Sequence, residues 1–240
     1  MCNPKRAAAK GALALIKELG AELQSIGIGT GSTVGWFVEE SKDLIREATT
    51  VASSSLDTAL KLARIGVGSV HPSTITRLDL YVDGADEVAG DGSLVKGRGA
   101  ALLGEKILAY SSRLNIIIVD ESKLVQTLGE RKPIPIEVHK DALMTTLKTL
   151  DAMGLNPKLR SSTGKDGPVI SDWGGVIIDL YTGPLTNVDP AKLEAELKSI
   201  PGVIEVGIFT GLTDYVVVGT RECEWRVMKF KRTRGLHLGD

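Results

Sequence analysis

The chain is poor in cysteine, histidine and aromatic side chains. Its 240 residues include two cysteines, three histidines and only 4% aromatic residues. Cys2 and Cys223 lack the paired spacing of a zinc or redox motif, so the simplest expectation is two reduced thiols in the cytoplasm. The histidines are scattered along the sequence, which indicates neither a catalytic triad nor a metal cluster.

An excess of one charge and long apolar runs are missing as well. The 29 Lys and Arg residues against 30 Asp and Glu residues give a net charge of -1, which provides no overall attraction to nucleic acid. No apolar run approaches the roughly 20 residues that span a bilayer, and no signal-peptide core follows the N-terminus. We therefore expect no nucleic-acid partner, no membrane association and a cytoplasmic location. Basic residues crowd only the end of the chain, which we expect to be a solvated tail: Arg226, Lys229, Lys231, Arg232 and Arg234.

Hydrophobic residues make up 42% of the chain, and their pattern in its first half predicts a parallel sheet. Short apolar strands are expected at residues 25–30, 49–53, 78–82 and 115–120, and helices at 5–19, 34–41, 56–65 and 98–113. Alternating strands and helices are typical of an α/β fold with a doubly wound, mostly parallel, Rossmann-like sheet.

The pattern changes beyond residue 130, where two prolines within 132–138 are typical of a linker or an edge strand. The expected order is then βαββαβ, that of a ferredoxin-like α+β unit, with strands at 136–138, 158–160, 176–180 and 203–209 and helices at 142–153 and 190–199. The apolar run 216–219 is a late strand that can return to the first sheet. The sequence thus predicts a Rossmann-like domain of residues 1–131 and 206–240 and a smaller domain of residues 132–205.

A turn rich in glycine and hydroxyl groups follows the first expected strand and precedes a helix, with the sequence Gly29-Thr30-Gly31-Ser32-Thr33. Its backbone N–H groups and hydroxyls can bind a phosphate at the positive end of the helix dipole. The alternative is a tight turn whose Ser or Thr only caps the helix. The turn has neither the full GxGxxG spacing nor the lysine of a P-loop, so a dinucleotide is not expected.

The densest chemistry follows the expected strand at 78–82, in the runs Asp83-Gly84-Ala85-Asp86-Glu87 and Lys96-Gly97-Arg98-Gly99. Open α/β sheets place their ligands at the carboxyl edge, where these carboxylates would lie. Two carboxylates could bind Mg²⁺, but no histidine is close in sequence, and Lys96 suits an anionic intermediate better than a cation site. An aspartate-rich turn satisfied by its own backbone is the other alternative.

Glu105 falls on an apolar arc of the expected helix 98–113, together with Leu102 and Leu108. Burial favours the neutral form of a carboxyl, as a general base that works near neutral pH requires. The alternative is a buried salt bridge, for example with Lys123, which follows the strand end at residue 120.

Taken together, these motifs closely resemble the ribose-5-phosphate isomerase type A family over residues 5 to about 220. The resemblance implies interconversion of D-ribose 5-phosphate and D-ribulose 5-phosphate through a cis-enediol, in the non-oxidative pentose phosphate pathway. It implies no metal and no organic cofactor. It also implies a homodimer or a dimer of dimers.

The resemblance assigns roles to individual residues. Glu105 matches the base that shuttles the proton. The other catalytic matches bind the sugar hydroxyls, help to open the ring and stabilise the enediolate: Asp83, Asp86 and Lys96. Further matches to substrate-binding positions are Thr30, Gly31, Ser32, Thr33, Gly84, Ala85, Gly97, Arg98, Gly99 and Lys123. Lys5 matches a position at which some members contact the phosphate.

Two other functions fit the sequence less well. A non-catalytic phosphosugar sensor of a transcription regulator would carry a DNA-binding helix-turn-helix, and we expect none before Gly20. An amino-sugar-phosphate deaminase would place a histidine near the catalytic carboxylates, and the sequence shows none there.

Overall fold

The computed structural model describes residues 2–20 and 23–236. By their contacts the residues group into two compact units. Unit 1 is made of Met1–Ala85, Gly104–Lys123 and Gly211–Asp240, and unit 2 is made of Asp86–Leu103 and Leu124–Thr210. The division into domains at 132–205 and the remainder stays a prediction.

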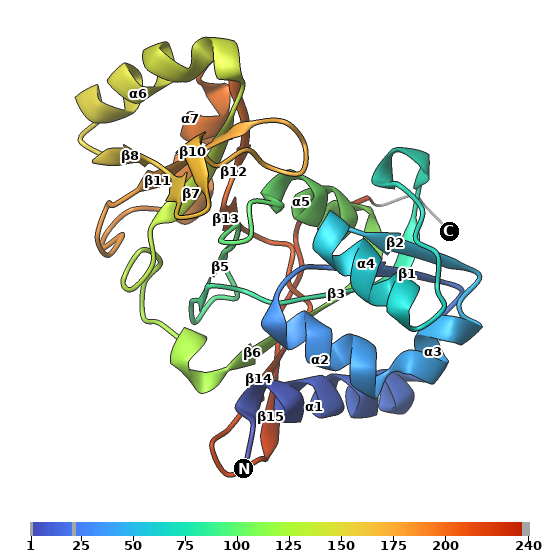
Figure 1. The fold of residues 1–240 in the computed structure, drawn as a ribbon. Coiled ribbons are helices and arrows are strands. Elements are labelled where there is room, and N and C mark those ends of the chain that lie inside the picture. Colours follow the sequence, from blue (N-terminus) through green and yellow to red (C-terminus); the bar gives the residue numbers. More distant parts are fainter. Residues whose placement is uncertain (1, 21–22, 237–240) are drawn as a thin grey trace. The chain divides into compact units, whose positions relative to one another are not determined.

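Unit 1 is built on a six-stranded sheet. Its strands are β1 (Ser25–Ile28), β2 (Thr50–Ser53), β3 (Leu78–Asp83), β6 (Ser112–Asp120), β14 (Tyr215–Gly219) and β15 (Trp225–Lys229). The strand order is β15-β14-β6-β3-β1-β2, and only β15 is antiparallel to its neighbour (Figure 1). The mostly parallel sheet and the return of β14 to it confirm the predicted Rossmann-like α/β fold.

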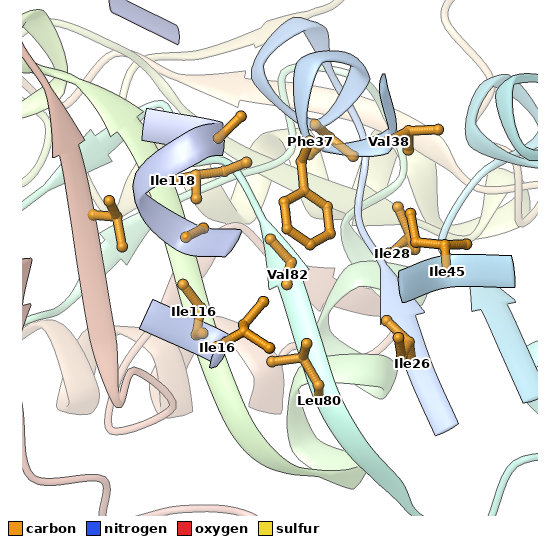
Figure 2. Packing of buried hydrophobic residues seen from close by; sticks show 14 of the residues in the cluster. Ile16, Ile26, Ile28, Phe37, Val38, Ile45, Leu80, Val82, Ile116 and Ile118 are labelled. Atoms are coloured by element: carbon orange, nitrogen blue, oxygen red, sulfur yellow. The ribbon is translucent and has the colours of Figure 1, made fainter. Parts of the chain in front are cut away.

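Helices cover both faces of this sheet: α1 (Pro4–Leu19), α2 (Ser32–Glu40), α3 (Lys42–Glu47), α4 (Leu56–Arg64) and α5 (Leu102–Ser111), with the short 3-10 helices η1 (Pro72–Thr74) and η2 (Glu121–Lys123). Phe37 of α2 packs in one buried cluster with Val82 of β3, and Figure 2 shows its ring directed at that side chain. On the opposite face a Cβ added to Gly27 would lie 3.6 Å from Leu108 of α5. Successive residues of a strand therefore pack alternately against the helices on one face of the sheet and those on the other.

Unit 2 contains a four-stranded antiparallel sheet and two smaller sheets. Its elements are β4 (Glu87–Val88), β5 (Leu94–Val95), β7 (Ile134–Val138), η3 (Lys140–Ala142), α6 (Leu143–Ala152), β8 (Pro157–Leu159), β9 (Ser161–Ser162), β10 (Lys165–Pro168), β11 (Val176–Leu180), α7 (Pro190–Ser199), β12 (Val203–Val206) and β13 (Ile208–Phe209). The main sheet has the order β12-β7-β11-β8. With α6 and α7 the chain order is βαββαβ, which confirms the predicted ferredoxin-like arrangement.

The two cysteines form a disulfide, so the expectation of two reduced thiols was wrong. Cys2 precedes α1, Cys223 lies in the turn between β14 and β15, and their Cα atoms are 5.5 Å apart. Helix α1 packs against both of these strands, which brings the two cysteines together although 221 positions separate them. Spacing along the sequence carries no signal for a pair that only the tertiary fold creates.

The basic end of the chain is not a free tail, which is a second correction, although Arg226, Lys229, Lys231 and Arg234 are exposed as expected. Residues Trp225–Lys229 form β15 and pair with β14. The Arg232 side chain is 10% exposed, donates to the Ala109 carbonyl at 3.2 Å and lies 3.7 Å from the Asp214 carboxylate. Burial lowers the pKa of Arg232 and raises the pKa of Asp214, and their ion pair opposes both shifts.

Two local expectations also differ from the structure. Helix α5 begins at Leu102 rather than at residue 98, because Gly97 (φ 105°) and Ala100 (φ 57°) have left-handed backbones. The proline segment forms β7, an interior strand between β12 and β11 instead of a linker or an edge. The Pro135 carbonyl accepts the Gly207 N–H at 2.7 Å, so the pairing there does not need the N–H that proline lacks.

Among the described helices, none combines the length and the apolar character needed to cross a bilayer.

Candidate active site

The carboxyl ends of β1 and β3 mark the topological switch point of the sheet in unit 1. Strand β2 lies on one side of β1 and β3 lies on the other, so successive connections leave in opposite directions. Open α/β sheets bind ligands at such a point. The loop Gly29–Thr33 follows β1, and Asp83 is the last residue of β3. Two of the predicted groups therefore lie together where the fold favours a site.

The Asp83 side chain is fully buried, and both of its carboxylate oxygens accept hydrogen bonds. Its Oδ1 accepts the N–H groups of Thr30 at 3.0 Å and of Gly84 at 2.7 Å, and its Oδ2 accepts the Tyr81 hydroxyl. The carboxylate also packs on Gly29, where an added Cβ would lie 1.9 Å from Asp83 Cγ. Asp83 thus connects the end of β3 to the start of the glycine-rich loop.

Tyr81 belongs to this cluster although the sequence patterns do not single it out. Burial, the Asp83 carboxylate and the Glu105 carboxylate raise the pKa of its hydroxyl well above the usual range, so Tyr81 stays protonated and donates to Asp83. Glu105 lies in the first turn of α5 and is 2% exposed, which confirms its predicted burial. Alternate residues of a strand share a face, so the position of Tyr81 two residues before Asp83 is the signal that could have found it.

The glycine-rich loop presents the positive end of α2. Gly31 is the N-cap residue of this helix, and no side chain caps it there. Ser32 and Thr33 lie inside the first turn, so the alternative of a capping hydroxyl is wrong. The Ser32 hydroxyl instead accepts a hydrogen bond from the Lys5 ammonium of α1 at 2.9 Å. A cation and a helix N-terminus therefore meet at this loop.

Helix α4 holds the other end of the loop in place. Thr58 is fully buried, donates to the Gly29 carbonyl at 2.6 Å and lies 3.1 Å from the Thr30 hydroxyl. The Ser55 hydroxyl, at the N-cap of α4, also contacts Thr30.

Lys123 is partly buried and is the last residue of η2, which directly follows β6, the strand next to β3. It therefore lies at the same edge of the sheet.

Ala85 follows Gly84 as the last residue of the first segment of unit 1, and the remaining predicted residues belong to unit 2. The Arg98 N–H donates to Asp86 Oδ2 at 3.0 Å, and Arg98 Nε lies 3.8 Å from Asp86 Oδ1. Lys96 is 2% exposed, its N–H donates to the Gly207 carbonyl at 2.9 Å, and its ammonium lies 5.6 Å from the centre of the Phe209 ring. This unit thus brings Asp86 together with the loop that carries Lys96. Within residues 2–20 and 23–236, no group of three or more His, Cys, Asp or Glu side chains is arranged to hold a metal ion.

Comparison with known proteins identifies the family of the chain. The profile of the family Ribose 5-phosphate isomerase A (phosphoriboisomerase A) matches residues 50–223. The chain is 48% identical to ribose-5-phosphate isomerase A of Aeropyrum pernix, over 98% of this chain and 99% of that relative. The solved structure of ribose 5-phosphate isomerase A from Methanocaldococcus jannaschii is 35% identical and covers 94% of this chain and 98% of its own, with a TM-score of 0.84. A D-ribose-5-phosphate isomerase solved in complex with phospho-erythronic acid is 37% identical and covers 94% of this chain and 97% of its own, with a TM-score of 0.85. The chain therefore belongs to the ribose 5-phosphate isomerase A family.

Proposed function

We propose that this protein interconverts D-ribose 5-phosphate and D-ribulose 5-phosphate through a cis-enediol, as an aldose-ketose isomerase of the non-oxidative pentose phosphate pathway. The observation that carries the proposal is the cluster in unit 1, where the buried Glu105, Tyr81 and Asp83 lie beside a loop suited to phosphate. Membership of the family supports the reaction, and the phospho-erythronic acid bound by a homologue supports a phosphosugar as the substrate.

The substrate phosphate binds at the start of α2 in this proposal. Backbone N–H groups of the first helical turn and the hydroxyls of Ser32 and Thr33 donate to its oxygens. The Lys5 ammonium, already hydrogen-bonded to Ser32, neutralises part of the phosphate charge. Thr30 and Gly31 complete the loop, and Lys123 binds the substrate from the same edge of the sheet.

Glu105 moves the proton. Its carboxylate accepts the proton from C2 of the open-chain aldose, the C–H electron pair becomes the C1–C2 double bond, and negative charge moves to O1. Glu105 then returns the proton to C1, O1 takes up a proton, and O2 loses one to become the ketone oxygen. Burial of Glu105 excludes water that would otherwise compete for the proton.

Three further residues bind the sugar and stabilise the charge that develops on it. In this proposal Asp83 and Asp86 bind the sugar hydroxyls and help to open the ring, and the Lys96 ammonium stabilises the enediolate oxygen. The short residues Gly84 and Ala85 between the two aspartates, and the loop Gly97–Gly99 after Lys96, let the substrate approach the backbone.

The proposal also includes chemistry without a metal, a cytoplasmic location and a homodimer or dimer of dimers. The metal-free chemistry is what the family resemblance implies, and an isomerase assay with EDTA tests it. Light scattering of the purified chain tests the oligomer, and a monomer mass would contradict it.

The decisive experiment compares wild type with Glu105→Gln in an isomerase assay on ribose 5-phosphate that contains EDTA. We expect the wild type to be active and kcat of the variant to fall by about 10²- to 10⁴-fold, the usual contribution of a general base. Glu196→Gln, an exposed position on α7, serves as the control and should keep wild-type activity. Calorimetry with phospho-erythronic acid should show that Glu105→Gln still binds the ligand.

Each contrary outcome identifies the step that fails. A fully active Glu105→Gln variant contradicts the assignment of the base, and loss of wild-type activity in EDTA contradicts the metal-free mechanism. Binding of phospho-erythronic acid by a wild type that turns over no ribose 5-phosphate would favour a phosphosugar sensor. Release of ammonia from an amino-sugar phosphate would favour the deaminase.

A further inference from the structure

Arg160 of unit 2 contacts the backbone of the loop that carries Lys96. It follows the last residue of β8, and its Nη1 donates to two successive carbonyl oxygens, that of Gly97 at 2.9 Å and that of Arg98 at 3.0 Å. These carbonyls belong to the two residues directly after Lys96. The guanidinium therefore constrains the backbone directly after the lysine.

Asp179 of β11 fixes the orientation of this guanidinium. Arg160 Nε donates to Asp179 Oδ2 at 2.8 Å, and Nη2 donates to Oδ1, which makes a bidentate pair. The two side chains are 15% and 11% exposed, so solvent screens the pair little. Strand β11 pairs with β7 and β8 in the interior of the sheet. The guanidinium is thus held on a rigid element and presents its remaining edge to the loop.

The backbone of the loop next to Lys96 has a restricted conformation. Gly97 has a φ of 105°, and an added Cβ would lie 3.1 Å from Leu102 Cβ and 3.3 Å from Pro135 Cβ. The Lys96 N–H is bonded to the Gly207 carbonyl. The lysine is thus fixed on its N-terminal side by β-sheet pairing and on its C-terminal side by Arg160. Both contacts hold the backbone from which its buried side chain projects.

We propose that Arg160, oriented by Asp179, is a positioning residue that keeps the Lys96 ammonium aligned with the enediolate oxygen. The inference rests on the role proposed above for Lys96. Arg160 acts through two backbone carbonyls and does not touch the substrate. An arginine is required because one planar group must pair with a carboxylate along one edge and donate to two carbonyls along the other, which a lysine ammonium cannot do.

The first test compares Arg160→Ala and Arg160→Lys with wild type in the assay on ribose 5-phosphate. A misplacement of about 1 Å can lower a rate by about 10²-fold, so we expect kcat of the alanine variant to fall by about that factor while KM stays near the wild-type value. Arg160→Lys should fall nearly as far because it keeps the charge but not the geometry. Guanidinium ion added at millimolar concentration should restore part of the activity of Arg160→Ala and none of that of Arg160→Lys.

The second test is a double-mutant cycle with Lys96→Ala. If Arg160 acts through Lys96, the variant that carries both substitutions should have the kcat of Lys96→Ala alone. Additive losses would overturn the inference, and so would an Arg160→Ala variant with wild-type kcat. If the wild type itself does not isomerise ribose 5-phosphate, the proposed function fails, and that outcome is distinct from additivity measured on an active enzyme.

A destabilised variant separates positioning from general damage to unit 2. Leu197 of α7 is fully buried in the core of that unit, so Leu197→Ala weakens the unit at a position outside the loop. At a temperature where both variants are folded by circular dichroism, Leu197→Ala should keep kcat within about twofold of wild type. An equal loss of kcat in Leu197→Ala and Arg160→Ala would reduce Arg160 to a structural role.

Discussion

Reduction of the Cys2–Cys223 disulfide is expected to lower the free energy of unfolding substantially. The bond closes a loop of nearly the whole chain, since 221 positions separate the two residues. In the chain-entropy model, closing a loop of that length lowers the conformational entropy of the unfolded state, which raises the free energy of unfolding by about 5 kcal/mol at 25 °C. We take this value as the upper limit and expect a measured loss of about 2–5 kcal/mol, the range found when native disulfides are removed.

The assay is unfolding in guanidinium chloride with and without dithiothreitol, on wild type and on a variant with both Cys2→Ser and Cys223→Ser. Both cysteines are exposed, so the reductant reaches the bond in the folded protein. Reduced wild type and the serine variant should unfold at the same lower midpoint, and dithiothreitol should leave the variant unchanged. The isomerase activity below the transition should not change, because the bond lies at the turn between β14 and β15 and outside the proposed site.

Two results would refute this reasoning. If denatured wild type without reductant titrates two free thiols, the bond does not form. If the bond forms but its reduction leaves the unfolding midpoint unchanged, the constraint on the unfolded chain has no net effect on stability.

Two further substitutions and one control variant test the structure. Gly29→Ala places a Cβ against the Asp83 carboxylate, and we expect it to cost about 1–3 kcal/mol in chemical denaturation and to lower kcat. Gly35→Ala in α2 is its control, because a Cβ added there would lie 3.8 Å from its nearest neighbour, Lys61 Cε. We expect this variant to raise the free energy of unfolding by about 0.5–1 kcal/mol. Equal stability of the two variants would contradict the packing argument. Glu137→Gln tests a pH dependence, because burial raises the pKa of this carboxyl despite hydrogen bonds from Ser171 and from backbone N–H groups. Because this pKa is raised in the folded state, the wild type loses stability as the pH rises through the folded-state pKa of Glu137. The variant should therefore gain stability relative to wild type from pH 5 to pH 8. A difference in stability that stays constant or changes in the opposite direction would contradict this prediction.

Much of the fold follows from local patterns in the sequence. Helix α1 ends at Leu19, as the predicted range 5–19 has it, and its C-cap Gly20 adopts a left-handed backbone (φ 59°) that glycine favours. The apolar runs of β1, β3, β6 and β14 predict buried parallel strands. Their order then places Gly29 and Asp83 together, because the carboxyl ends of adjacent parallel strands meet at one edge. Periodicity and chain order were sufficient for these features.

The contacts that complete the site could not be predicted in the same way. Lys5 reaches Ser32 across 27 positions, and Arg160 reaches Gly97 across 63. The disulfide spans 221 positions. Such contacts depend on how elements pack and on which side chains then meet, which periodicity within one element does not encode. For the same reason the pairing of β15 with β14 was missed, since its basic residues resemble a solvated segment when read alone.

The interleaving of the two units has a consequence for the synthesis of the protein. Unit 1 combines three segments of the chain, and its strand β14 lies between β6 and β15. Helix α1 packs closely on β14, where a Cβ added to Gly219 would meet the Pro4 carbonyl oxygen. On the ribosome, α1 must therefore keep part of its apolar face exposed until almost the entire chain has been translated. The four-stranded sheet of unit 2 comes from the single segment Leu124–Thr210 and can form earlier. The first helix to be made is thus among the last elements to reach its final contacts.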